Sequence, residues 1–68
     1  MNAIEERVYT LTDEANTLAA ELYDSLEAIR YDPVGTTSDD IGSMKEICGL
    51  LRQTLERANA VKENAGRG

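Results

Sequence analysis

Few residues in this chain have the chemistry for catalysis. The 68 residues include no histidine and a single cysteine, Cys48, so the side chain that most often performs acid-base work at neutral pH is missing. Cys48 stands on an apolar helical stripe without a nearby base, which is typical of a small buried residue and not of a nucleophile. Carboxylates are plentiful, but no histidine completes the carboxylate metal motif of helical bundles. The sequence therefore predicts a protein that is not an enzyme and holds no metal or cofactor.

Two glycines within the predicted second helix raise the hypothesis of a small anionic ligand. Gly42 and Gly49 stand seven residues apart, and glycine inside a helix costs roughly 0.5 to 1 kcal/mol relative to alanine. Gly49 thus predicts the close approach of a backbone or a ligand. One hypothesis is a pocket for a nucleotide or small anion at a subunit junction, and the alternative is a solvated face. The candidate pocket residues are Tyr9, Tyr23, Arg30, Lys45, Gly49 and Arg52.

Helical periodicity must position these side chains. Apolar residues recur at steps of three and four along the first part of the chain, the spacing that lines one side of a helix. Read as heptads, the pattern puts Ser25 in a core row, with Leu26 widening the seam beside it. We expect a helix over about 3–31, started by a capping box of Asn2 and Glu5. Its stripe is Ile4, Val8, Leu11, Ala15, Leu18, Leu22, Leu26 and Ile29.

A turn and a second helix follow. Pro33 disfavours helical backbone in the residue before it, so the turn is expected at about 32–37 and the second helix at about 38–64. Thr37 or Ser38 is its predicted cap, and Gly66 is expected past its end. So short a connection joins antiparallel neighbours, which predicts a single all-α helical-hairpin domain over 1–68 with a short C-terminal tail. The expected seam of the second helix is Ile41, Met44, Cys48, Leu51, Leu55 and Ala58.

The second helix has more apolar surface than one neighbouring helix covers. Its apolar arc reaches about halfway round the helix, and two amphipathic helices form only one seam. We therefore expect the antiparallel hairpin to assemble into a four-helix bundle or a higher symmetric oligomer. The competing interpretation is a groove for a helix of a different protein. The predicted interface consists of Ile47, Leu50, Leu51, Thr54, Ala58 and Val61.

Charge is divided unevenly along the chain, whose net charge is -6. Residues 1–40 carry ten acids and two bases, whereas residues 41–68 carry three acids and five bases. We expect Glu14 and Glu21 to flank the seam beside Lys45 and Arg52. An acidic chain repels phosphate backbones, so direct nucleic-acid binding is not expected and a basic partner is favoured. The predicted recognition surface is the outer face of the first helix and its end: Glu6, Asp13, Asp24, Glu27 and Tyr31.

The function that these features predict is that of a small oligomeric interaction module. It is expected to regulate or inhibit a macromolecular partner by occupying its surface, and to bind both itself and another protein. Three alternatives stay open: an acidic nucleic-acid mimic that blocks a DNA- or RNA-binding protein, an oligomer that sequesters the anionic ligand, and a structural assembly component. No uninterrupted apolar run approaches the roughly 20 residues that cross a bilayer, so we expect a cytoplasmic protein without membrane contact.

Overall fold

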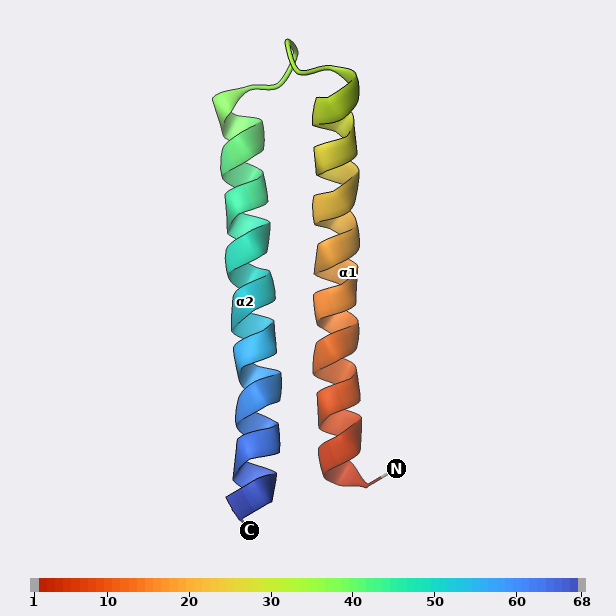
Figure 1. The fold of residues 1–68 in the computed structure, drawn as a ribbon, viewed down its shortest axis with the longest axis vertical. Helices are drawn as coiled ribbons and strands as arrows, with labels where there is room; N and C mark the ends of the chain where they lie inside the picture. Colours follow the sequence, from red (N-terminus) through yellow and green to blue (C-terminus); the bar gives the residue numbers. More distant parts are fainter. Residues whose placement is uncertain (1, 68) are drawn as a thin grey trace.

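The chain folds into two long helices that lie side by side and run antiparallel (Figure 1). The computed structural model describes residues 2–67, and side chains for residues 2–66. Helix α1 spans Ala3–Tyr31 and helix α2 spans Ser38–Arg67. Together they form a rod with extents of 52 × 19 × 12 Å, with the start of α1 and the end of α2 at one end and the turn at the other. The all-α helical hairpin that the sequence predicts is confirmed.

Reciprocal hydrogen bonds fix the start of each helix. The Asn2 side chain accepts from the backbone N–H of Glu5 at 2.8 Å, and the Glu5 carboxylate accepts from the N–H of Asn2 at 3.4 Å. At the start of α2, the N–H of Asp40 donates to Thr37 Oγ1 at 3.2 Å and the N–H of Thr37 donates to Asp40 Oδ2 at 2.9 Å. Each pair satisfies backbone donors that have no partner within a helix. Of the two caps considered for the second helix, the structure uses Thr37.

Asp32 organises the turn. Its backbone N–H donates to the carbonyl of Ala28 at 3.0 Å and closes α1. Its carboxylate accepts from the N–H of Gly35 at 2.9 Å, and its carbonyl accepts from the hydroxyl of Thr36 at 3.0 Å. A Cβ atom on Gly35 would lie 2.8 Å from Asp32 Cγ. An alanine at position 35 would therefore displace the aspartate carboxylate from its hydrogen bond with the backbone.

Helix α2 continues past the end that the sequence pattern predicts. The expected end was about residue 64 with Gly66 beyond it, but the helix runs to Arg67. A glycine ends a helix most effectively when it adopts a left-handed conformation. No glycine in the described part of the chain has a positive φ, so Gly66 extends the helix instead of capping it.

Heptad spacing describes the seam between the helices. The α1 residues of the seam are Val8, Leu11, Ala15, Leu18, Leu22, Ser25 and Ile29, and the α2 residues are Met44, Ile47, Leu51, Thr54, Ala58 and Val61; all are buried or half-buried. The inclusion of Ser25 agrees with the heptad interpretation of the first helix. Ile4 and Leu26, which the sequence stripe also contained, are exposed. The seam is thus the narrow two-row contact that a single pair of helices makes.

The seam between the helices buries few side chains. The buried residues of the described chain are Ala15, Met44, Thr54 and Ala58, and no described side chain is fully buried. Thr54 is the polar member of this group, and its hydroxyl donates to the carbonyl of Leu50 at 2.9 Å. The hairpin exposes 5348 Å², whereas a compact folded monomer of 7.5 kDa exposes roughly 4,200 Å². About 1,100 Å² more surface is therefore in contact with solvent than in a typical folded domain of this mass.

Candidate interaction surface

Most of the residues that the sequence predicted for an outer interface lie instead in the seam between the two helices. Of the six predicted interface residues, Leu51, Thr54 and Ala58 lie in the seam together with Ile47 and Val61, and only Leu50 is exposed. Conversely, three residues of the predicted α2 seam are exposed: Ile41, Cys48 and Leu55. The predicted α2 seam is wrong in these three residues. The seam lies at the centre of the apolar arc of α2, which buries more apolar surface than a contact at the edge of that arc.

The apolar residues that the seam leaves over form an apolar flank, which we define as Ala19, Leu26, Ile41, Cys48 and Leu55; Ala19 is half-buried and the other four are exposed. Leu26, Ile41 and Leu55 are 52%, 49% and 48% exposed. Two shallow grooves follow this flank. Leu22, Leu26, Ile41 and Cys48 contribute to one groove. Ala15, Ala19, Leu51 and Leu55 contribute to the other. Because both helices contribute to both grooves, the apolar flank is a surface of the hairpin and not of one helix.

The opposite flank of the hairpin is polar over most of its length, with a groove lined by Ile4, Ala60 and Val61 near its open end. Seven-residue steps along α2 place Ser43, Leu50 and Arg57 on it, and the same steps along α1 place Glu14 and Glu21 there. Leu50 is 51% exposed, nearly the same fraction as Leu55, but its neighbours at these steps are hydrophilic. Exposed apolar residues that stand alone are ordinary on protein surfaces. The two flanks therefore differ in kind, and the apolar one is the candidate interaction surface.

The expected ion pairs between the helices do not form. Glu14 and Glu21 lie on the polar flank, whereas Lys45 and Arg52 line a groove of the apolar flank. The ion pairs found among the described residues join neighbours within one helix: Arg30 with Glu27 at 3.9 Å, and Arg52 with Glu56 at 3.8 Å. The glutamates and the two bases lie on opposite flanks of the hairpin, so they do not meet. Exposed pairs of this kind contribute little to stability.

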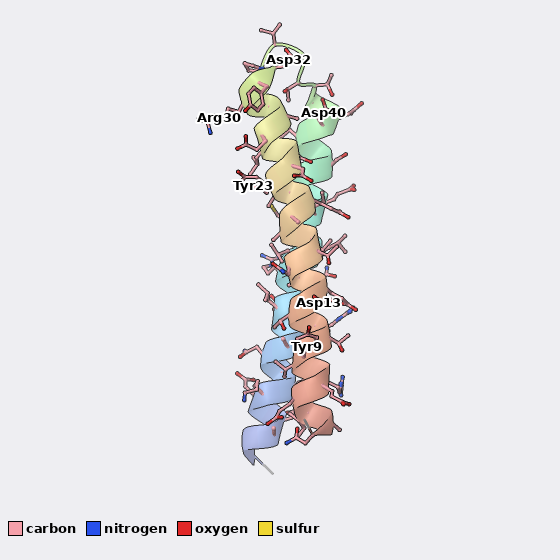
Figure 2. All side chains as sticks on the ribbon, turned by 90° about the vertical axis from the view of Figure 1, so that its right-hand side faces the viewer. Tyr9, Asp13, Tyr23, Arg30, Asp32 and Asp40 are labelled. Carbon is pink, nitrogen blue, oxygen red and sulfur yellow. The ribbon has the colours of Figure 1, made fainter. Side chains whose placement is uncertain are left out.

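The structure brings together only part of the predicted ligand pocket. Lys45, Gly49 and Arg52 line one groove of the apolar flank, and Tyr9 lines the other. Tyr23 and Arg30 project from the same side of α1 in Figure 2. Apart from the local backbone of α2, no atom lies within 4 Å of the position that a Gly49 Cβ would occupy. The close backbone approach expected at Gly49 is therefore not made within this hairpin.

The acidic residues predicted for recognition lie along the exterior of α1. Glu6, Asp13 and Asp24 are exposed, and Glu27 is half-buried beside Arg30. Asp13 follows Glu6 by seven residues, a rise of roughly 10 Å along a helix. Successive phosphates of a nucleic-acid strand are only about 3.4 Å apart along the duplex axis. Tyr31, at the end of α1, is 82% exposed.

The described residues contain no group of three or more His, Cys, Asp or Glu side chains placed to hold a metal ion. Neither described helix combines the length and the apolar character that crossing a membrane requires.

Comparison with known proteins leaves the surface itself as the guide to function. No family model, curated protein or solved structure matches this chain. The apolar flank, its grooves and the charges beside it are therefore the features from which a function can be inferred.

The apolar flank is the feature that the sequence reasoning missed. A signal for it was present. On α2, four neighbouring rows at seven-residue steps contain Ile41, Met44, Ile47 and Leu50, and the two middle rows are the centre of the apolar arc. A seam placed on the middle rows leaves the Ile41 row outside, where it lies beside the charged row of Lys45. The predicted seam lay one row too close to the charged row of Lys45.

Proposed function

We propose that this chain is a small non-catalytic interaction module that packs its apolar flank against another helical surface and thereby regulates a macromolecular partner. The observation that supports the proposal is the pair of grooves lined by Leu26, Ile41, Cys48 and Leu55 together with the rest of the apolar flank. Contiguous apolar surface on a small protein marks a binding site more often than isolated residues do. A partner helix that lies along the flank would contact it through its own residues at three- and four-residue steps.

The acidic exterior of α1 favours basic partners over acidic ones. Glu6, Asp13 and Asp24 lie on the outside of this helix, whose basic residues are only Arg7 and Arg30. Complementary charge speeds encounter with a basic partner and repels acidic ones more than it adds affinity. The wide separation of these carboxylates does not favour mimicry of a nucleic acid, so we assign them a steering role.

The proposal is tested by comparing two leucine variants as bait in extracts of the native host. Leu55→Gln changes the apolar flank and Leu50→Gln changes the polar flank, and the two leucines have nearly equal exposure. A partner of the module is expected to bind the unmodified chain and Leu50→Gln and to be lost with Leu55→Gln. Circular dichroism at the bait concentration checks that both variants remain helical. Equal capture by both variants would contradict the proposal.

A further inference from the structure

We propose that the apolar flank is covered by a second copy of this chain, in a dimer whose two-fold axis runs parallel to the helices. In this arrangement both turns lie at the same end of a four-helix bundle, and α1 of each copy lies against α2 of the other. The inference rests on the proposed function, because it takes the apolar flank as a binding surface and names a second copy as its occupant; a different protein that binds through Leu55 then competes with that copy for the same surface. Three observations carry it: exposed area, helix charge and the residues beside the flank.

Exposed area sets the size of the interface. The hairpin exposes 5348 Å², about 1,100 Å² above the value typical of its mass. A standard stable interface buries roughly 800 Å² per partner. The excess on one hairpin is therefore sufficient for a complete interface with a second copy. Because no described side chain is fully buried, the hairpin also needs this burial for its own stability.

Helix charge selects the orientation of the second copy. Helix α1 contains seven acids and two bases, whereas α2 contains five acids and five bases. If the turns lay at opposite ends of the bundle, α1 would lie along α1 of the other copy and two strongly acidic helices would repel each other. With the turns at the same end, each acidic α1 lies along the neutral α2 of the other copy. Charge complementarity therefore favours turns at the same end.

The residues beside the flank agree with the same orientation. Lys45 and Arg52 border it on α2 and share one groove with Leu22 and Leu26 of α1. A two-fold axis parallel to the helices keeps each residue at its own level, so with the turns at the same end these bases lie near the level of Tyr23 on α1 of the other copy. Lysine and arginine are attracted by the faces of tyrosine rings. In the opposite orientation, the two Arg52 side chains, at mid-length of α2, would face each other.

The orientation is tested by a distance between the two turns. Val34 is 95% exposed in the turn, so a spin label at Val34→Cys does not disturb the seam. The native thiol is removed by Cys48→Ala, which keeps the flank apolar. Neighbouring helices in a bundle are about 8–10 Å apart, so turns at the same end place the labels within about 25 Å. Turns at opposite ends place them near the 52 Å length of the rod. A measured distance near that length overturns the proposed orientation.

The mass of the assembly in solution tests whether a second copy of this chain covers the apolar flank. Sedimentation equilibrium of the unmodified chain and of the labelled variant at micromolar concentration is expected to give the mass of two chains, and the melting temperature is expected to rise with protein concentration. A helical monomer or an assembly larger than a dimer overturns the inference. A helical monomer that still captures a different protein through Leu55 would overturn the dimer and leave the proposed function standing. A dimer that forms equally well with Leu55→Gln would overturn the assignment of the dimer interface to the apolar flank, and the capture experiment would still decide the proposed function.

Discussion

The substitution Leu55→Gln gives the most direct measure of what the apolar flank contributes. Leu55 is 48% exposed in the hairpin, so a partner can cover about half of its side chain. Complete burial of a leucine contributes about 1.5–3 kcal/mol, and covering the remaining half contributes about 0.7–1.5 kcal/mol. A two-fold dimer contains this contact twice, which brings the loss to about 1.5–3 kcal/mol. Since 1.4 kcal/mol is a factor of ten, the dimer dissociation constant is expected to rise about 10- to 150-fold.

Leu50→Gln is the matched control for this measurement. It is the same chemical change at a residue that is 51% exposed, but on the polar flank, where the dimer makes no contact. We expect its dissociation constant to stay within about threefold of the unmodified value, as for surface substitutions in general. Sedimentation equilibrium over a range of concentrations measures both constants, and circular dichroism reports helix content in the same samples. Similar weakening by the two substitutions, or a larger effect of Leu50→Gln, would refute the assignment of the interface to the apolar flank.

Three further substitutions test the local structure, each by thermal or urea unfolding at one fixed protein concentration. Gly35→Ala is expected to lower the free energy of unfolding by about 0.5–1.5 kcal/mol, because its Cβ displaces the Asp32 carboxylate and breaks its hydrogen bond; unchanged stability would contradict this. Gly42→Ala has open space around the new Cβ and should raise stability by about 0.5–1 kcal/mol; a loss would point to an unrecognised contact. Thr54→Val places a methyl group in the seam and should raise stability by about 0.5–1 kcal/mol; a loss would show that the hydrogen bond from the Thr54 hydroxyl to the Leu50 carbonyl stabilises the fold.

The sequence was sufficient for the elements of this fold but not for the rotation of α2. Residues such as Asn2, Glu5 and Pro33 define helix ends through local hydrogen bonds and backbone sterics, so the ends they predict depend on a few neighbouring residues. In α1 the stripe is narrow, and its centre was identified with Ser25 included. In α2 the arc is wide, so several rotations bury similar area and periodicity alone does not choose among them.

The candidate site depended on that rotation, which explains why its prediction was less successful. Turning α2 by one row exchanges the Ile47 row for the Ile41 row, and it moves Lys45 and Arg52 relative to the glutamates of α1. Ile47 and Leu55 are both large aliphatic residues, so composition does not distinguish the inner row from the outer one. The choice is made by packing against α1 over the whole length of the seam, and this is a property of the pair of helices.

The position of the turn has a practical consequence for engineering. The start of α1 and the end of α2 lie at the same end of the rod, far from the turn between the helices. A short linker can therefore join the two old ends while the backbone is opened within the turn, giving a circular permutant in which α2 precedes α1. Shortening or lengthening such a linker changes closure entropy only slowly, so the order of the helices along the polypeptide is a free design variable for this rod.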